Sequence, residues 1–244
     1  MNNTKVKLYQ VVEAILYRLK TGCQWRQLPM KQFFRCSYKW ESVYYHFQKW
    51  CKDGSWQKVW QVVLNKHKNL LDMSSIQLDG THTPTKRGGE AVAYQGRKKS
   101  KTSNMIILTD SQGIPLCCSE PLSGNHNDAY NLSNNFRSML SEIHSSGIST
   151  DGLFLNADAG FDSEDFRKCC FQNEIIDNID KNQRNGSSQD HYFDELLYKC
   201  RFVIERTNAW LDAFKAILVR FETNKIHWKA LNIIAFTIIL LRRL

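Results

Sequence analysis

The sequence predicts an α/β protein in which an N-terminal helical segment precedes a mixed sheet flanked by helices. Apolar residues recur at helical spacing over the first 72 residues, whereas short apolar runs bounded by turn residues follow from residue 73. A chain of 244 residues is long enough for one large domain, or for one domain with a smaller companion. We therefore expect a helical domain over 1–72 and an α/β domain over 73–244.

Three helices are expected in the N-terminal segment. The first runs from Leu8 to Leu19, with Gly22 as its stop, because apolar residues repeat every three or four positions. The second covers 40–50 with Ser37 as its N-cap, and the third begins at Ser55. Lysines and arginines on the outer faces are typical of a helix-turn-helix-type DNA-binding module, although a bundle that serves only packing has the same pattern.

Strands dominate the following region. The runs SSIQLDGTHTP (74–84), NMIILTD (104–110) and IPLCCSEPL (114–122) predict three strands, and Ser111-Gln112-Gly113 predicts a hairpin turn between the last two. A helix over 129–143 follows, capped by Asn127 or Asp128. The run LFLNAD (153–158) predicts a fourth strand, and Ser163 caps the helix after it.

The C-terminal part completes the pattern. EIIDNID (174–180) predicts a fifth strand, the polar run 181–190 a loop, and long apolar periodicities predict helices over 194–221 and from His227 onward. Three strands, a helix, a strand, a helix, a strand and a helix is a ribonuclease-H-like order. We therefore expect a mixed five-stranded sheet of that type.

Charge and cysteine usage limit the class of function. The chain has 33 basic and 24 acidic residues, a net charge of +9, which favours nucleic acid as a partner ahead of an anionic membrane surface. The most apolar stretch, 231–241, is shorter than the roughly 20 residues that span a bilayer. The eight cysteines form no C-x-x-C pair and no signal peptide is present, so reduced thiols in a cytoplasmic protein are expected.

Three acidic residues are candidates for a metal-dependent site. Asp79 and Asp158 end the first and fourth predicted strands, and Glu205 lies on the predicted helix over 194–221. In a ribonuclease-H-like topology these three places adjoin, and clustered carboxylates are the ligands that hard divalent cations take. Taken singly, each aspartate is typical of a turn or cap residue, and the glutamate of a solvated helix face.

The same predicted helix carries Tyr198 and Arg201. They precede Glu205 at a spacing that places all three on one helix face. An arginine beside a metal-binding carboxylate suits a scissile phosphate, and a surface salt bridge between Arg201 and Glu205 is the structural alternative.

A basic run lies between the first two long strands. Six cations against Glu90 give it a net charge of 6 − 1 = +5, which suits the backbone of a substrate DNA; they are Lys86, Arg87, Arg97, Lys98, Lys99 and Lys101. A solvated basic loop has the same composition. His126 and Asp128, at the start of the helix over 129–143, are expected to shape the site from behind its ligands or to cap that helix.

Several blocks together resemble DDE transposases of bacterial insertion sequences. The spacing of Tyr198, Arg201 and Glu205 is similar to the Y-R-E signature of that family. LDGTHTPTKRGGEAVAYQGRKKSKT, LTDSQGIPL, GNHNDAYNL and NADAGFDSEDF, together with the tryptophan-rich N-terminal segment, look like its other blocks. Two features depart from the family pattern: Asp212 stands where a lysine or arginine is usual, and the first helix starts close to Met1.

The resemblance implies an activity and its requirements. Asp79, Asp158 and Glu205 would be the catalytic triad holding two Mg²⁺ ions, with Mn²⁺ as a substitute, and Tyr198 and Arg201 would contact the DNA of the transposon end. The region 1–72 is then expected to be the DNA-binding domain and 73–244 the catalytic domain. No nucleotide cofactor is expected, since no Walker-type loop is present. The expected partner is double-stranded DNA, both the terminal inverted repeats and the target, bound by a homodimer in a nucleoid-associated bacterial protein. A DNA-binding regulator without catalysis and a hydrolytic nuclease of the same fold remain alternatives.

Overall fold

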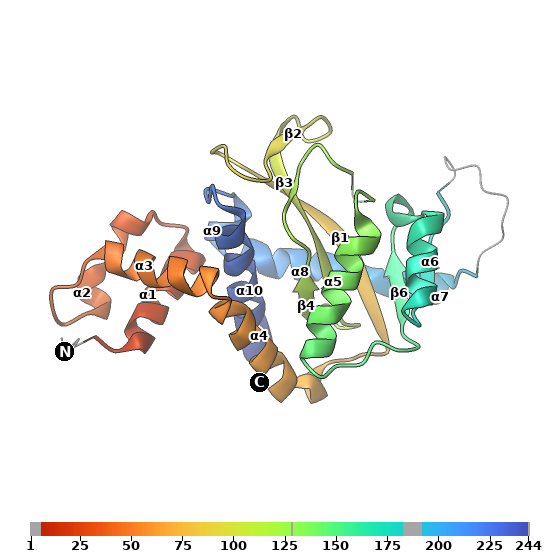
Figure 1. Cartoon of the computed structure of the whole chain (residues 1–244), viewed down its shortest axis with the longest axis horizontal. Coiled ribbons are helices and arrows are strands. Elements are labelled where there is room, and N and C mark those ends of the chain that lie inside the picture. The colour runs from red at the N-terminus through yellow and green to blue at the C-terminus, as the bar shows by residue number, and fades with distance from the viewer. Residues whose placement is uncertain (1–5, 128, 183–191, 244) are drawn as a thin grey trace.

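The computed structural model describes residues 6–127, 129–182 and 192–243, and Figure 1 shows a helical end joined to a sheet with helices on both sides. The helical end contains α1 (Leu8–Thr21), η1 (Trp25–Gln27), α2 (Met30–Phe33), α3 (Trp40–Lys52), α4 (Ser55–Lys66) and η2 (Lys68–Leu70). The predicted helices are thus present, with α2 and two 3₁₀ turns added. The structure includes no helix, among the residues it describes, that is long and apolar enough to cross a membrane.

The helix ends agree with the sequence in part. Gly22 ends α1 in the left-handed conformation (φ 71°), as predicted, because glycine adopts this conformation without strain. The predicted caps Ser37 and Ser55 are wrong: α3 follows Lys39, and α4 follows Gly54 (φ 74°). The Ser55 N–H instead donates to Asp53 Oδ1 (3.0 Å), so the aspartate satisfies the first turn of α4.

The sheet has the predicted ribonuclease-H-like order. Its strands are β1 (Ser75–Pro84), β2 (Ala93–Gln95), β3 (Ser100–Thr109), β4 (Pro115–Cys118), β5 (Leu122–Ser123), β6 (Phe154–Ala157) and β7 (Ile176–Ile179). They are arranged β2-β3-β1-β6-β7, with β4 and β5 also on β3. β1 pairs antiparallel with β3 and parallel with β6, and β6 pairs parallel with β7.

The described sheet contains seven strands rather than the predicted five. The predicted third strand is split into β4 and β5, and between them lies Pro121, which has no N–H for the ladder to β3. β2 is the other addition. It pairs with the first residues of β3, which begins at Ser100, earlier than its apolar run indicated.

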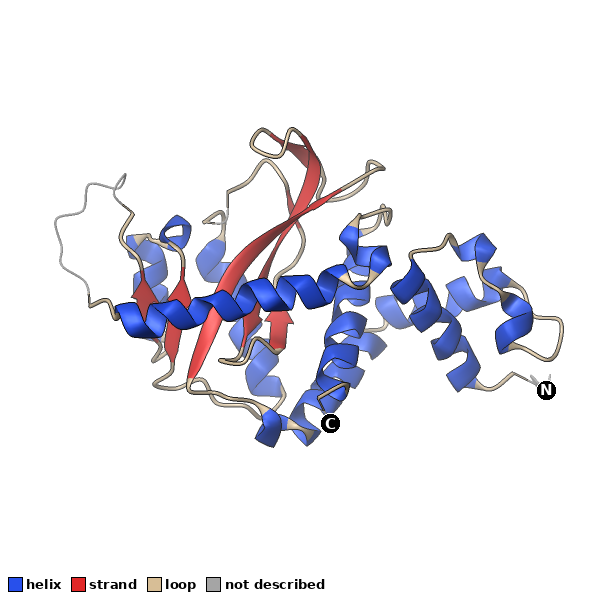
Figure 2. Ribbon diagram, turned by 180° about the vertical axis from the view of Figure 1, so that it is seen from behind, coloured by secondary structure: helices blue, strands red, loops and turns tan. Residues whose placement is uncertain are grey.

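Helices cover both faces of the sheet. Figure 1 shows α5 (Leu132–Ser145) and α6 (Glu164–Gln172) on the near face, and Figure 2 shows the helical segment containing α8 crossing the opposite face. Ser163 caps α6 as predicted, since its Oγ accepts from the Phe166 N–H (3.2 Å). Asn131 (φ 51°), not Asn127, precedes α5, and the predicted alternative cap Asp128 lies outside the described residues.

The single helix predicted over 194–221 is wrong. The chain forms α7 (Glu195–Lys199), η5 (Cys200–Phe202), α8 (Val203–Asp212) and α9 (Lys215–Leu218) instead. The backbone leaves the helical conformation at Phe214 (φ −96°, ψ 97°), which is 1% exposed. Local periodicity continues through this break because the buried side chains on either side of it keep helical spacing.

The C-terminal helix joins the two ends of the molecule. α10 (Lys225–Leu241) begins at its cap Asn224 and lies between the N-terminal helices and the sheet (Figure 1). Trp60 of α4 packs edge-on against Phe236 of α10 and donates from Nε1 to the Leu116 carbonyl of β4 (2.9 Å). Buried residues of the helical end and of the sheet therefore belong to one hydrophobic core.

Candidate active site

Asp79 and Asp158 are delivered by adjacent parallel strands in matching register. Gln77 of β1 is the register partner of Asn156 of β6, an offset of 156 − 77 = 79 residues. Asp79 and Asp158 have the same offset, 158 − 79 = 79, and come two residues further along the two strands. Because side chains of a strand alternate between faces, the two aspartates project on the same face as those partners.

The Asp79 carboxylate is largely buried and lies beside a cation. Its side chain is 19% exposed, and Arg201 Nη1 stands 3.7 Å from its Oδ1. Burial raises the pKa of Asp79 to about 6, and the negative charges of Asp158 and Glu205 push it in the same direction. Arg201 and the Gly80 N–H oppose this shift. Both of the other acids predicted from the sequence therefore act electrostatically on Asp79.

Glu205 is more open to solvent than Asp79, whereas Asp158 is half-buried like Asp79. Asp158 follows β6 and precedes η3 (Ala159–Phe161), and its Oδ1 accepts from the Gly160 N–H (2.8 Å). Glu205 lies in the first turn of α8 and is exposed. Within the described ranges no group of three or more His, Cys, Asp or Glu side chains is close enough to hold a metal ion. The carboxylate set is nevertheless of the kind that Mg²⁺ and Mn²⁺ prefer.

Tyr198 and Arg201 lie on the stretch that leads to Glu205. Asp194 caps α7, because its Oδ1 accepts from the N–H groups of Leu196 (2.8 Å) and Leu197 (2.9 Å). The Arg201 guanidinium lies over the Tyr198 ring, 5.7 Å from its centroid, and reaches Asp79 from there. The predicted alternative of an Arg201–Glu205 salt bridge is not formed: Arg201 pairs with Asp79.

The turn at residues 111–113 is hydrogen-bonded to α8. Thr207 Oγ1 donates to the Gly113 carbonyl and Arg206 Nη2 to the Gln112 carbonyl, each at 2.5 Å. The turn is organised by Asp110, whose carboxylate accepts from the N–H groups of residues 72, 112 and 114 (3.0, 3.0 and 2.7 Å). The Ser111-Gln112-Gly113 turn predicted from the sequence therefore also fixes the helix that carries Glu205.

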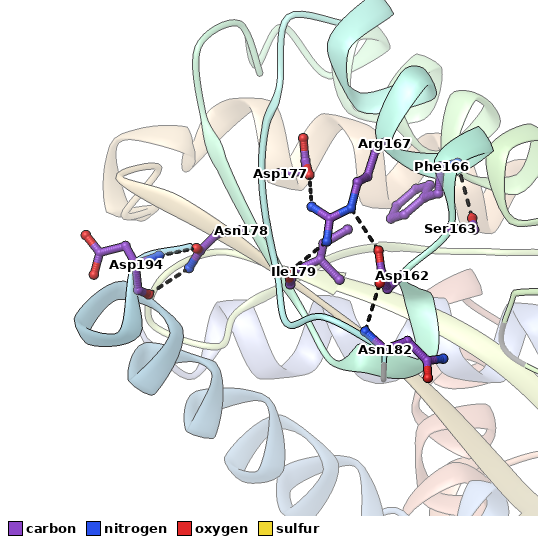
Figure 3. Close-up of polar contacts among 9 residues, drawn as sticks. All are labelled: Asp162, Ser163, Phe166, Arg167, Asp177, Asn178, Ile179, Asn182 and Asp194. Atoms are coloured by element: carbon purple, nitrogen blue, oxygen red, sulfur yellow. Dashed lines mark hydrogen bonds and ion pairs between the residues drawn. The ribbon is translucent and has the colours of Figure 1, made fainter. Parts of the chain in front are cut away.

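A buried row of side-chain amides crosses β1, β6 and β7 next to the acids, and it was not predicted from the sequence. Gln77, Asn156 and Asn178 lie on β1, β6 and β7, each 0% exposed, and we call this row the amide ladder. Figure 3 shows its end, where Asn178 exchanges two hydrogen bonds with the backbone of Asp194. A signal was present in the sequence: in three of the apolar runs a polar residue stands two positions before an acid that ends the apolar stretch, at Gln77, Asn156 and Asn178.

An arginine holds the turn that follows Asp158. Arg167 of α6 donates from Nε to Asp162 Oδ1 (2.8 Å), from Nη1 to Asp177, and from Nη2 to the Ile179 carbonyl (3.0 Å), as Figure 3 shows. Arg167 is 7% exposed, so these bonds replace its hydration. The loop after Asp158 is thereby tied to the end of β7.

Five of the six predicted DNA-binding cations lie between β1 and β3 and Lys101 lies at the start of β3; all six are exposed: Lys86, Arg87, Arg97, Lys98, Lys99 and Lys101. These cations lie on a projection formed by β2 and the adjoining parts of β1 and β3, and Arg220 is hydrogen-bonded to residues at its base. It donates from Nη2 to the Glu90 carbonyl (2.8 Å) and from Nη1 to Ser103 Oγ. Arg87 also lines a cavity of about 600 Å³, together with Trp25 and Trp40 of the helical end.

The remaining candidates lie apart from these contacts. The His126 ring stacks on the Tyr130 ring (3.7 Å between centroids), and the backbone N–H of His126 donates to the Ser123 carbonyl (3.0 Å). Asp128 is outside the described residues. Asp212 is exposed at the last position of α8, and its carbonyl accepts from Lys215 Nζ (3.3 Å).

The comparisons with known proteins agree with this arrangement. Residues 78–242 match the family described as "DDE superfamily endonuclease". The chain belongs to this family. Residues 2–60 match "Putative transposase of IS4/5 family", and the two matches together identify the chain as a DDE transposase. Endonucleases of the DDE superfamily use divalent metal ions.

Two further comparisons contribute little. A search of curated protein sequences gave no match. Among solved structures, the Mos1 transposase paired-end complex with the left transposon end is 11% identical, with a TM-score of 0.34, over 95% of this chain and 77% of the other.

Proposed function

We propose that this DDE transposase cleaves the ends of an insertion sequence and joins the freed 3′-OH to target DNA, with Asp79, Asp158 and Glu205 holding two divalent ions. The observation that carries the proposal is the matched register of Asp79 and Asp158. It places two carboxylates on one sheet face, and Glu205 on α8 is near enough to raise the pKa of Asp79. When bound, Mg²⁺ or Mn²⁺ would supply activation of the attacking oxygen and stabilisation of the leaving 3′ oxygen.

Arg201 is the residue that we assign to the scissile phosphate. Its guanidinium already faces a carboxylate, that of Asp79, and a phosphate oxygen presents the same kind of acceptor. A phosphate that enters the site would take over this donor while the cations neutralise Asp79. Tyr198, under the guanidinium, restricts where Arg201 can point.

DNA outside the reacting bond requires further contacts. The six exposed cations between β1 and the start of β3 suit the phosphate backbone, and the N-terminal helices suit recognition of the terminal inverted repeats. His126 and Asp128 are proposed to support the site from behind its ligands. Two ends have to be held together for transposition, so we expect a homodimer in the active complex.

Substitution of the three acids tests the proposal. With an oligonucleotide that carries the terminal repeat, and with Mn²⁺ present, Asp79→Asn, Asp158→Asn and Glu205→Gln should each abolish nicking, because each removes a charged ligand. Binding of the DNA end in a gel-shift assay should change less than about threefold. Asp151→Asn, at an exposed turn before β6, is the matched control and should cleave as the wild type does.

Each contrary result has a definite meaning. Full cleavage by any one of the three variants removes that residue from the site. A wild-type protein that binds the end but never nicks it is a regulator. One that nicks but does not transfer a pre-cut end to target DNA is a hydrolytic nuclease.

A further inference from the structure

We propose that the amide ladder of Gln77, Asn156 and Asn178 is a positioning device that aligns the two catalytic strands with the helix carrying Arg201 and Glu205. The inference rests on the proposed function for the role of the acids, but the hydrogen bonds that carry it do not depend on that function. None of the three amides contacts the DNA or the metal ions in this assignment; they act through the residues that do.

The ladder is a continuous chain of hydrogen bonds across three strands. Asn178 Nδ2 donates to Asn156 Oδ1 (2.7 Å), and Asn156 Nδ2 donates to Gln77 Oε1 (2.9 Å). Gln77 Nε2 then donates to Ser75 Oγ (2.9 Å) within β1. All the bonds run in the same direction, and such chains strengthen their members.

The position of the ladder relative to the acids is fixed by strand geometry. Gln77 and Asn156 are register partners, as are Asn156 and Asn178. Gln77 stands two residues before Asp79, and Asn156 two residues before Asp158, so ladder and acids share one face of the sheet. A slip of one residue between β1 and β6 would separate both pairs at once.

The ladder also reaches the opposing helical segment. Asn178 Nδ2 donates to the Asp194 carbonyl (3.1 Å), and Asn178 Oδ1 accepts from the Asp194 N–H (2.8 Å). Asp194 is the N-cap of α7, which leads to Arg201 and Glu205. Three strand positions and the start of this helix therefore form one hydrogen-bonded unit.

Burial of three amides has an energetic cost that apolar residues would avoid. Their side chains are fully enclosed, and a buried amide without a hydrogen-bond partner destabilises the folded state. Apolar side chains would stabilise the sheet without selecting a register, whereas each amide is satisfied only when its neighbours are in place. Alignment of the site is the property that the ladder adds.

Hydrogen exchange of the metal-free protein tests the alignment directly. Asn156→Ala removes the middle of the ladder, and its hydrogen bonds go to Gln77 and Asn178 rather than to α7. Backbone amides of 195–205 should exchange about tenfold faster than in the wild type. Asn232→Ala is the matched control: it removes another buried amide (3% exposed), bonded to the Trp228 carbonyl in α10, and should leave 195–205 unchanged.

Mn²⁺ affinity, measured by electron paramagnetic resonance without DNA, provides the second readout. We expect about 10- to 100-fold weaker binding in Asn156→Ala, as is typical for loss of groups that orient ligands. The double variant Asn156→Ala/Asn178→Ala should bind Mn²⁺ no more weakly than either single variant, because the ladder acts as a unit. Gln77→Met preserves the side-chain volume and serves if Asn156→Ala does not fold.

The two readouts separate the ladder from the proposed function. If Asn156→Ala resembles Asn232→Ala in both exchange and Mn²⁺ affinity, the ladder is only structural and the inference is overturned. If Asp79→Asn binds Mn²⁺ and cleaves DNA normally, the assignment of the acids fails, while exchange at 195–205 still decides whether the ladder aligns the helix.

Discussion

Burial raises the pKa of both Asp79, which is largely buried, and Asp110, which is fully buried, to about 6, but the surroundings of the two aspartates differ. The Asp79 carboxylate faces other acids and one cation, which is a strained environment that a metal ion would relieve. The Asp110 carboxylate instead accepts three backbone N–H bonds that close a turn. A raised pKa therefore identifies a buried carboxyl group, and its partners identify its role.

Asp110 makes the stability of the protein depend on pH. Burial raises the pKa of Asp110 to about 6, above its value near 4 in the unfolded chain. The folded state therefore binds the proton more tightly than the unfolded chain does. The contribution of Asp110 to the free energy of unfolding is thus fully present below about pH 4 and is lost as the pH rises through 6. The loss amounts to about 3 kcal/mol at most.

Denaturant unfolding from pH 4 to 7 measures this effect. Asp110→Asn, which does not titrate, should remove about that much of the pH slope, although its mean stability falls because one carboxylate acceptor is lost. An unchanged slope in Asp110→Asn would assign the dependence to other groups. Asp151→Asn is the exposed control.

At the scale of residues, the sequence alone indicated the acids but not their supports. Asp79 and Asp158 end strand-like runs, and such ends are recognisable locally. Gln77, Asn156 and Asn178 acquire their meaning only from partners on neighbouring strands, at sequence separations of 79 and 22 residues. The polar residue two positions before each acid is visible in the sequence, but nothing local indicates which residues on other strands it bonds to.

At the scale of elements, β1 and the two parallel strands were predicted well, and the helical segment after β7 was not. Strand and turn residues alternate clearly in the sequence, so the order of strands could be derived. The break at Phe214 could not, because its cause is the burial of that ring in the shared core. Tertiary packing there overrides local helical periodicity.

The projection formed by β2 and the adjoining parts of β1 and β3 gives a prediction at this scale. Lys98→Gln/Lys99→Gln should weaken DNA binding and make the slope of log K against log salt shallower by about 2, since two phosphate contacts are lost. Arg137→Gln/Lys168→Gln, exposed on α5 and α6, should change the slope less. Equal slopes for both pairs would exclude a specific role for the projection.

At the scale of the whole molecule, a buried ion pair joins the helical end to the segment before α10. Arg18 Nη2 of α1 lies 2.6 Å from Glu222 Oε1, and the two side chains are 5% and 9% exposed. Burial lowers the pKa of Arg18, and Glu222 opposes that shift. The division into 1–72 and 73–244 stays a prediction, and this pair, which bridges that boundary, was not visible in the sequence.

Removal of one partner of the Arg18–Glu222 ion pair should lower the free energy of unfolding much more than removal of both partners. Arg18→Met or Glu222→Gln alone should destabilise the protein by about 3–5 kcal/mol, because a buried charge or its donor is left unpaired. Arg18→Met/Glu222→Leu should recover most of that loss, measured by chemical denaturation. Additive losses would show that the two groups contribute independently.

The short 3₁₀ turn Cys200–Phe202 between α7 and α8 has a geometric consequence. A 3₁₀ step advances 120° around the axis and an α step 100°, so three such steps rotate α8 by about 60° relative to α7. Glu205 therefore points in a different direction relative to Tyr198 than an uninterrupted α-helix would give it. If this turn adopted α-helical geometry, the Glu205 carboxylate would rotate around the helix axis. The three residues of the turn therefore determine the direction in which Glu205 points relative to α7.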